Sequence, residues 1–223
     1  MLEATPPQSL PDNLRNRCYA ARLKRCADIL GASVLLIALT PLMLATWVVV
    51  RMVLGKPVLY LDERAGQNGR PILIAKFRSM STATGLDGEP LPDAQRLRLA
   101  GKILRCTSLD ELPQLLSVLS GDMSLIGPRP LPMRYIPRYS RRQATRLLVR
   151  PGLSGWAQIR GRNAIDWPTR LELDATYVEM LGRWYAPLLD LWILVATLFQ
   201  IIWQALTARG IAAPGSATMQ EFQ

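Results

Sequence analysis

The sequence predicts an α+β protein that is mostly helical, with long apolar helices and one small β-hairpin. Three observations indicate this class. Residues 29–50 form an apolar stretch without any charge, long enough for a membrane helix. Two short strand patterns follow, separated by Asn68-Gly69, a strong turn signal. Amphipathic helical patterns recur in the remaining chain. The 223 residues are enough for one domain with a substantial core, so we expect a single domain.

We divide this domain, residues 1–223, into five segments. Residues 1–27 are a polar leader, 28–54 a membrane helix, 55–185 a cytoplasmic part, 186–208 an interfacial amphipathic helix, and 209–223 a flexible tail. The first apolar run is not followed by a small-x-small cleavage pattern, so the leader does not resemble a cleaved secretory signal. We therefore expect the protein to lie on the cytoplasmic face of a membrane.

Two features of the first apolar stretch favour a re-entrant helix, which enters and leaves the bilayer through one leaflet. Pro41 supplies no N–H to the carbonyl of Ile37, so we expect a helix-break-helix at Thr40-Pro41, where the Thr40 hydroxyl can partly satisfy a carbonyl one turn earlier. Basic residues also flank both ends, which the positive-inside rule would keep in the cytoplasm. They are Arg15, Arg17, Arg22, Lys24 and Arg25 before the stretch, and Arg51, Lys56, Arg64 and Arg70 after it. A spanning helix is the alternative.

The part of the chain after Gly55 begins with strand patterns. Val58–Leu61 and Ile72–Phe77 are typical of two strands of a hairpin, and residues 80–92, rich in Thr, Gly, Asp and Pro, are typical of a loop. A basic amphipathic pattern over residues 93–104 predicts a short helix. A second helix should begin at Ser108 and end at Gly121, a residue type that often terminates helices.

Six arginines spaced three or four residues apart predict a helix with a basic face. They are Arg134, Arg138, Arg141, Arg142, Arg146 and Arg150. Such a face is typical of a solvated helix. With tyrosines and leucines between the arginines, it equally suits a helix on an anionic membrane surface.

A second apolar stretch covers residues 188–206, but Asp190, Gln200 and Gln204 interrupt it. An interfacial amphipathic helix, with Trp192 and Trp203 at the level of the lipid headgroups, accounts for these polar positions better than a second membrane span does. A buried core helix is the alternative.

The charge of the chain points to an anionic partner. The formal net charge is +10, and nucleic acid, acidic lipid headgroups and phosphorylated substrates all fit such a protein. Because the sequence has no histidine, chemistry falls to carboxylates, Lys, Cys, Ser or Tyr. The adjacent Asp110 and Glu111 are the leading candidates, since a carboxylate can attack a phosphate or hold a metal against it. A structural role also fits, because Ser108 and Glu111 have the spacing of a helix capping box.

Several common catalytic motifs are missing from the sequence. It has no G-x-x-x-x-G-K-[ST] phosphate loop, G-x-G-x-x-G fingerprint, G-x-S-x-G elbow or Asp-x-Asp pair, which argues against kinases, dehydrogenases and α/β-hydrolases. Elements suited to phosphate remain, around Lys76 and Arg78, Ser108 to Glu111, Gly121-Asp122, Gly127-Pro-Arg129-Pro130 and Arg150-Pro-Gly152. The two prolines restrict the backbone beside Arg129, which lowers the entropy lost when its guanidinium meets phosphate oxygens. An ordinary surface turn is the alternative.

These motifs, in this order, resemble the small monotopic phosphoglycosyl transferases, the bacterial sugar transferase family, and especially its PglC-like members. The motifs that carry the resemblance are Leu23-Lys-Arg-Cys-Ala-Asp28, Ser108-Leu-Asp110-Glu111-Leu112, Gly121-Asp-Met-Ser-Leu-Ile-Gly-Pro-Arg-Pro130, Arg150-Pro-Gly-Leu-Ser-Gly-Trp-Ala-Gln158 and Gly161-Arg-Asn-Ala-Ile-Asp-Trp167. The region that contains them, from Leu23 to Trp167, covers about two thirds of the chain.

The resemblance implies transfer of a phosphosugar from a UDP-sugar to a polyprenyl phosphate, such as undecaprenyl phosphate, with release of UMP. It further implies initiation of glycoconjugate assembly at the bacterial inner membrane, with membrane lipids and no nucleic acid as partners, and a re-entrant helix bent at Thr40-Pro41. A homodimer is left open. A non-catalytic membrane-surface protein and a polyprenyl-diphosphate phosphatase are the competing interpretations.

The resemblance also assigns roles to individual residues. Asp110 is the expected nucleophile, and Glu111 is expected to assist Mg²⁺, with Asp122 as a further carboxylate near the metal. The expected phosphate- or substrate-binding residues are Arg129, Lys76, Arg78, Arg105, Arg150 and Asn163. The segment from Gly161 to Ile165 resembles members that use N-acetylated sugars, so we expect an N-acetylated donor.

Overall fold

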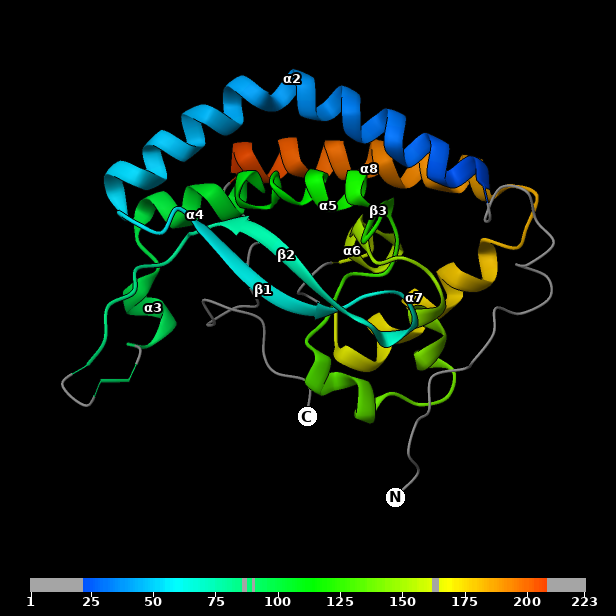
Figure 1. Cartoon of the computed structure of the whole chain (residues 1–223). Helices are drawn as coiled ribbons and strands as arrows, with labels where there is room; N and C mark the ends of the chain where they lie inside the picture. Colours follow the sequence, from blue (N-terminus) through cyan, green and yellow to red (C-terminus); the bar gives the residue numbers. More distant parts are fainter. Residues whose placement is uncertain (1–21, 86–87, 90, 162–164, 208–223) are drawn as a thin grey trace.

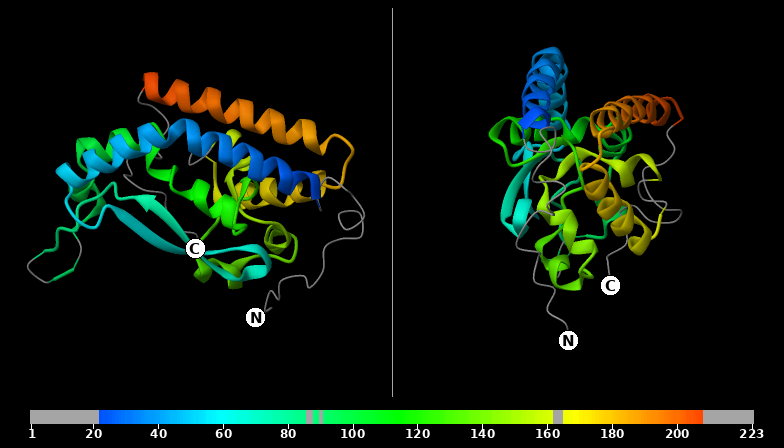
Figure 2. Two further views of the ribbon diagram at one scale, coloured as in Figure 1. Left: turned by 45° about the horizontal axis from the view of Figure 1, so that its top comes forward. Right: turned by 90° about the vertical axis from the view of Figure 1, so that its right-hand side faces the viewer.

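The computed structural model describes residues 22–85, 88–89, 91–161 and 165–207. Two long apolar helices, α2 (Lys24–Val53) and α8 (Ala186–Thr207), lie on one side of a smaller α+β part (Figures 1 and 2). This confirms the predicted class of a mostly helical α+β protein. The proposed tail and most of the leader fall outside the described residues.

The helix α2 runs without interruption through Pro41 and arches over the rest of the molecule (Figure 1). The prediction that the helix is interrupted at Thr40-Pro41 is therefore wrong. Proline removes only one backbone hydrogen bond, and the apolar residues on both sides continue the helix. The Thr40 hydroxyl donates to the carbonyl oxygen of Leu36 at 2.6 Å, rather than to that of Ile37 opposite Pro41.

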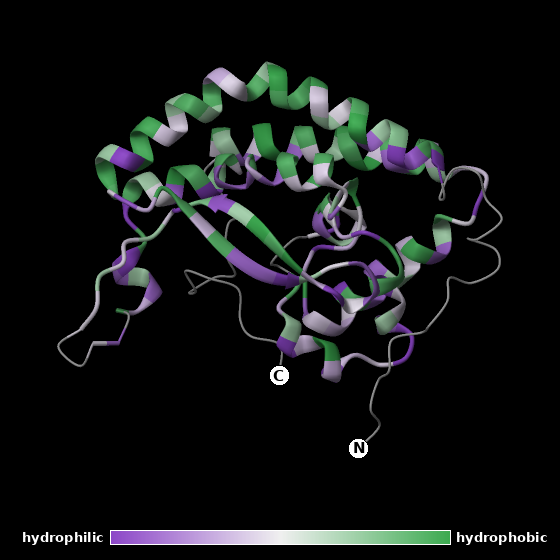
Figure 3. Cartoon of the chain, viewed as in Figure 1, coloured by the Kyte–Doolittle hydropathy of each residue, from purple (hydrophilic) through white to green (hydrophobic). Residues whose placement is uncertain are grey.

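Both long helices expose much of their apolar surface. In Figure 3 they are coloured mainly as hydrophobic, whereas most polar residues lie in the part below them. Side chains such as Ile37 of α2 and Leu206 of α8 are 77% and 79% exposed. By length and composition each helix could cross a bilayer. The outer surface of both helices is thus suited to lipid.

The polar residues of α8 face the protein. Asp190 is buried and accepts hydrogen bonds from Lys24 Nζ at 2.6 Å and from the Tyr177 hydroxyl at 2.7 Å. Gln200 donates to the carbonyl oxygen of Ile159, and Gln204 is buried. We expected polar residues on the water-exposed side of an interfacial helix. Instead they attach α8 to the protein and leave its apolar face outside.

The first two strands form the predicted hairpin. β1 (Leu59–Ala65) pairs antiparallel with β2 (Pro71–Phe77), in a register that places Asp62 opposite Ile74. The turn between them contains the short 3-10 helix η2 (Gln67–Gly69). Asn68 has a φ of 58° there, which Asn tolerates better than most residues. The strands are longer at the turn than predicted because the charged residues 62–64 continue the ladder.

The middle of the chain consists of short helices. Residues 93–106 form α3 (Asp93–Arg96) and α4 (Leu99–Cys106) rather than the single predicted helix. The 3-10 helix η3 (Leu109–Glu111) and helix α5 (Gln114–Ser120) follow. Gly121 ends α5 with a φ of 98°, which confirms the predicted C-terminal cap.

The second pair of strands is parallel and short. β3 (Ser124–Ile126) pairs with β4 (Gly152–Ser154), and α6 (Trp156–Ile159) and α7 (Trp167–Met180) follow. The backbones approach closely here: a Cβ atom on Gly152 would lie 2.0 Å from the backbone nitrogen of Gly127. Only glycine permits this contact, which places the segment after β3 directly above β4.

The predicted arginine-faced helix is wrong. Residues 133–148 form two separate 3-10 helices, η4 (Met133–Arg138) and η5 (Gln143–Leu148). Pro137 lies between the arginines and cannot donate to an α-helical ladder. Arg146 is buried, so the six arginines do not share one solvated face.

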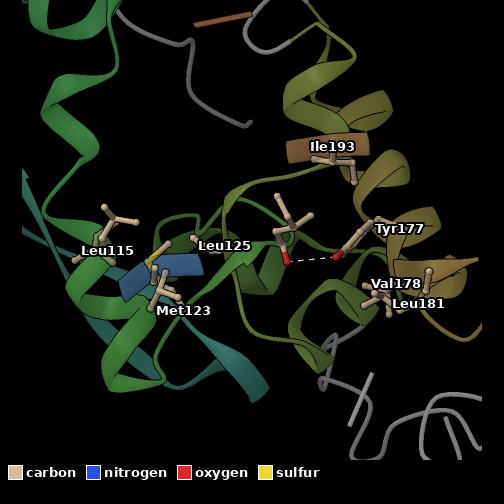
Figure 4. Close-up of a cluster of buried hydrophobic side chains, with 12 residues drawn as sticks. Leu115, Met123, Leu125, Tyr177, Val178, Leu181 and Ile193 are labelled. Carbon is tan, nitrogen blue, oxygen red and sulfur yellow. Dashed lines mark hydrogen bonds between the residues drawn. The ribbon is translucent and has the colours of Figure 1, made fainter. Parts of the chain in front are cut away.

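The main hydrophobic core joins the long helices to the α+β part. Figure 4 shows Leu115 of α5, Met123 and Leu125 around β3, Tyr177 of α7 and Ile193 of α8 in this cluster. Tyr177 also donates from its hydroxyl to the carbonyl oxygen of Ile126 at 3.3 Å. A fully buried polar contact supports the same junction: Asp28 of α2 accepts from the Ser124 hydroxyl and the Leu125 amide, both at 3.0 Å.

Candidate active site

A cavity of about 720 Å³ lies beneath the two long helices. The hairpin, η3, the segment after β3, and helices α6 and α7 supply its polar wall, and α2 and α8 supply apolar side chains. Six of the predicted site residues line it: Lys76, Arg78, Arg105, Asp110, Glu111 and Arg129. The structure thus brings together both candidate carboxylates and four of the predicted cations.

An unusual backbone conformation places the two carboxylates. Ser108 adopts a left-handed conformation with a φ of 55°, and η3 then carries Asp110 and Glu111 toward the cavity. The side chain of Ser108 makes no capping hydrogen bond. The capping-box interpretation is therefore wrong. Glu111 contacts Arg129 instead, through a side-chain ion pair that local spacing could not reveal.

Arg129 forms an ion pair with Glu111 within the cavity. Its Nη2 lies 2.6 Å from Oε1 of Glu111, and this carboxylate raises the pKa of the guanidinium. The Gly127 amide donates to the Ser154 carbonyl at 2.8 Å, and the Gly152 amide donates to the Pro128 carbonyl at 2.8 Å. These backbone bonds hold the arginine loop against β4. The alternative of an ordinary surface turn is therefore wrong for this segment.

A buried ion pair supports the arginine loop from behind. Arg146 donates through Nη2 to the carbonyl oxygen of Arg129 at 2.6 Å and to Asp174 Oδ2 at 2.8 Å. Its Nη1 donates to the Tyr139 hydroxyl at 3.0 Å. Both charged side chains are at most 2% exposed. Sequence reasoning missed this pair, because the spacing of Arg146 matched that of exposed arginines and its partner is far along the chain.

Burial and charge shift the pKa of Asp110. Burial is the largest cause and Glu111 the second, and they raise the pKa of Asp110 to about 7 against the opposing effect of Lys76, Arg105 and Arg129. Burial also lowers the pKa of the Lys76 ammonium, while Glu111 acts in the opposite direction. A strongly perturbed carboxylate among cations in a cavity is typical of a site that binds anions or performs chemistry.

Two cations near Asp110 have different surroundings. Arg105 of α4 donates through Nε to the Ser79 hydroxyl at 3.0 Å, and burial lowers its pKa while Asp110 opposes this shift. Arg78 donates to the carbonyl oxygens of Leu54 and Gly55 at the end of α2. Arg78 therefore ties α2 to the hairpin, although it lines the cavity.

Two of the predicted site residues that the structure describes do not line this cavity. Arg150 donates through Nε to the Gly121 carbonyl at 2.7 Å and so holds the end of α5. Asp122 is exposed and accepts from the Ser120 hydroxyl at 2.6 Å. Asn163 lies outside the described residues.

The carboxylates of the cavity suit a hard divalent cation only in part. Within the described residues no group of three or more Cys, Asp and Glu side chains could hold a metal ion. Asp110 and Glu111 are adjacent and line one cavity, however. Mg²⁺ commonly uses one or two carboxylates together with substrate phosphates and water. The donor set therefore fits Mg²⁺ delivered with a phosphorylated substrate.

Comparisons with known proteins show the family of the chain. A family profile described as bacterial sugar transferase matches residues 19–204. The uncharacterized sugar transferase EpsL of Bacillus subtilis is 44% identical over 200 residues, which are 90% of this chain and 95% of that protein. The chain is also 37% identical to the UDP-N-acetylgalactosamine-undecaprenyl-phosphate N-acetylgalactosaminephosphotransferase of Aeromonas hydrophila, with 82% of this chain and 44% of that protein covered.

A third relative is the UDP-glucose:undecaprenyl-phosphate glucose-1-phosphate transferase of Escherichia coli, which is 34% identical over 80% of this chain and 40% of its own length. The chain thus spans nearly all of the Bacillus relative, but less than half of the Aeromonas and Escherichia relatives. The match over residues 19–204 includes every residue that lines the cavity, all of α2 and all but the last three residues of α8. The chain belongs to the bacterial sugar transferase family.

Proposed function

We propose that this protein transfers a sugar phosphate from a UDP-sugar to undecaprenyl phosphate and releases UMP. Relatives named for this type of reaction use N-acetylgalactosamine, galactose or glucose. The observation that carries the proposal is a single cavity that joins charged groups suited to a diphosphate with apolar groups suited to a lipid.

The apolar end of the cavity suits the lipid acceptor. Side chains of both long helices line it: Leu35 and Leu39 from α2, and Leu194, Leu198 and Ile201 from α8. These helices expose apolar surface on their outer sides. An isoprenoid chain could remain in contact with the bilayer while its phosphate reached the charged end. The alternative of a protein that only binds a membrane surface does not account for the two partly buried carboxylates that line the cavity.

In the proposed reaction Asp110 attacks the phosphorus next to the sugar. Its carboxylate oxygen forms a bond to that phosphorus, and the bond from phosphorus to the oxygen bridging the two phosphates breaks, so that UMP leaves with the bonding electrons. A phosphate oxygen of undecaprenyl phosphate then attacks the same phosphorus and displaces Asp110. The product is a polyprenyl diphosphate sugar, and the enzyme regains its carboxylate.

The surrounding cations reduce repulsion between the carboxylate and the diphosphate. Lys76 and Arg105 both stabilise the charged form of Asp110, and Arg129 faces the same cavity while bound to Glu111. Positive groups held in place before the reaction can stabilise charge that develops on the leaving phosphate. This arrangement supports Asp110 as the nucleophile.

We propose Mg²⁺ as the cofactor, held by Asp110 and Glu111 together with oxygens of the diphosphate. When bound, Mg²⁺ would neutralise phosphate charge and favour release of UMP. Arg129 would continue to orient Glu111 through the ion pair at 2.6 Å.

We further propose that α2 is re-entrant and that the protein lies on the cytoplasmic face of the inner membrane. Both ends of α2 turn toward the α+β part, and its middle lies farthest from that part (Figure 1). Basic residues lie at both ends of the helix, including Arg25 and Arg51. In this orientation the charged end of the cavity would face the cytoplasm and would be accessible to the UDP-sugar. Single cysteines introduced at positions 22 and 56 test this orientation. If reagents label the two positions from opposite sides of the membrane, the helix spans the bilayer.

The experiment that tests the function measures UMP release with a panel of UDP-sugars, in the presence and absence of undecaprenyl phosphate. We place N-acetylated donors first in the panel, because the segment after Gly161 resembles members that use them. Intact mass spectrometry without acceptor should show one added sugar phosphate, mapped to Asp110. Product formation without any such adduct would contradict the covalent step. Phosphate release from a polyprenyl diphosphate, without need for a UDP-sugar, would instead support a phosphatase.

A further inference from the structure

A second, smaller pocket of about 180 Å³ adjoins the active-site cavity. Lys76, Arg64 and Arg129 line both spaces, whereas Asp110 and Glu111 line only the larger one. The shared cations therefore form a boundary, with the two carboxylates on one side and the small pocket on the other.

Gln114 contributes an amide group to the small pocket. Its side chain is 3% exposed, and its Nε2 has no hydrogen-bond partner within the described residues. A buried amide N–H without an acceptor is unfavourable in a folded protein. Such a group in a pocket lined by three cationic side chains indicates that an oxygen-bearing anion supplies the missing acceptor.

The size and charge of the pocket fit a phosphate group. Lys76 and Arg129 can reach an anion held between the two spaces, and Arg64 provides further positive charge beside its partner Asp62. The remaining lining includes Leu131 and Gly152, which bring no negative charge. A free sugar ring offers no charge to match these cations, so a phosphate is the better occupant.

We propose that this pocket holds the phosphate of the departing UMP and that Gln114 donates a hydrogen bond to it. The inference rests on the proposed function, because it assigns a place to one product of that reaction. In a displacement at phosphorus the attacking and leaving oxygens lie roughly in line. With Asp110 on one side of the cations, a leaving phosphate in the small pocket lies on the opposite side.

Two substitutions of Gln114 test the assignment. Gln114→Met keeps the length of the side chain but removes the donor, and Gln114→Glu keeps the shape but adds a negative charge. Gln95→Met is the matched control, since Gln95 is exposed and lines neither pocket. Two quantities are measured for each protein: the inhibition constant of UMP competing with the UDP-sugar, and the KM for undecaprenyl phosphate.

For Gln114→Met we expect the inhibition constant of UMP to rise roughly tenfold to a hundredfold, the effect of losing a hydrogen bond to a charged group. Gln114→Glu should raise it further. The control should match the wild type. An unchanged UMP constant would overturn the assignment. A raised KM for the acceptor alone would also overturn it, by showing that the pocket holds the acceptor phosphate.

A binding measurement separates failure of this inference from failure of the proposed function. UMP should raise the melting temperature of the wild type, and inorganic phosphate should do so at higher concentration. Gln114→Met should lose most of the UMP effect while melting no lower than the wild type without ligand, because its Nε2 makes no bond there. If no UDP-sugar yields UMP, the proposed function fails. If UMP stabilises the wild type and Gln114→Met equally, the inference fails.

Discussion

Replacement of Asp110 by asparagine should separate the chemical role of this carboxylate from its effect on stability. Asparagine has nearly the same shape but cannot act as the nucleophile. We expect UMP release to fall by more than about 10³-fold. At the same time we expect the folded protein to become more stable at neutral and alkaline pH, because the variant no longer buries a negative charge beside Glu111.

The size of the stability effect follows from the pKa of Asp110. An ordinary aspartate has a pKa of 3.8, whereas burial and Glu111 raise the pKa of Asp110 to about 7. This difference corresponds to at most about 4 kcal/mol above pH 7, and we expect about 1–3 kcal/mol because water enters the cavity. Between about pH 4 and pH 7 the folded wild type binds more protons than the unfolded chain. The contribution of Asp110 to the free energy of unfolding therefore decreases as the pH rises through this range, and the loss is complete above pH 7.

Urea denaturation of the wild type and Asp110→Asn at pH 5 and pH 8, in one detergent and with a chelator, measures this effect. The advantage of the variant should be larger at pH 8 than at pH 5. Asp62→Asn is a control, because Asp62 lines the same cavity but pairs with Arg64. An advantage of Asp110→Asn that does not change with pH would refute the electrostatic reasoning. Near-normal UMP release by this variant would remove the covalent mechanism, whatever its stability.

Three further outcomes are expected. Arg129→Ala should lower kcat/KM for the UDP-sugar by an amount that corresponds to about 2–4 kcal/mol; an effect on melting temperature alone would indicate a purely structural role. Removal of divalent cations with a chelator should abolish UMP release, and Mg²⁺ should restore it; full activity in the chelator would exclude the proposed cofactor. Ile202→Glu, on the exposed face of α8, should weaken binding to liposomes in flotation experiments without changing the fold seen by circular dichroism, because a carboxylate there would have to leave water. Unchanged flotation would mean that α8 does not meet lipid.

Local sequence signals predict only those elements that local interactions determine. Asn68-Gly69 correctly marks the hairpin turn, since both residues adopt positive φ angles. Gly121 correctly marks the end of α5 for the same reason. The spacing of Ser108 and Glu111 also suggests a local contact, but Arg129 binds Glu111 and the capping box does not form.

Long-range contacts account for most of what the sequence could not reveal. The regular spacing around Arg146 predicts an exposed helix, whereas its partner Asp174 lies on another element and both are buried. In the sequence Asp190 only interrupts an apolar stretch. In the structure it accepts hydrogen bonds from Lys24 and Tyr177. In the candidate site, motif resemblance identifies Asp110, but nothing in the spacing marks Gln114, whose surroundings come from distant strands and loops.

The contact of Lys24 with Asp190 has a consequence for how the protein assembles. It joins the first turns of the two long helices, and the Tyr177 hydroxyl connects the same carboxylate to α7. Removal of either charged side chain would leave the other unpaired and largely buried, which would lower the stability by roughly 3–5 kcal/mol. The two long helices and the part that holds the candidate site are therefore expected to fold and unfold as one cooperative unit, so that a protein with misplaced helices would also lose the site.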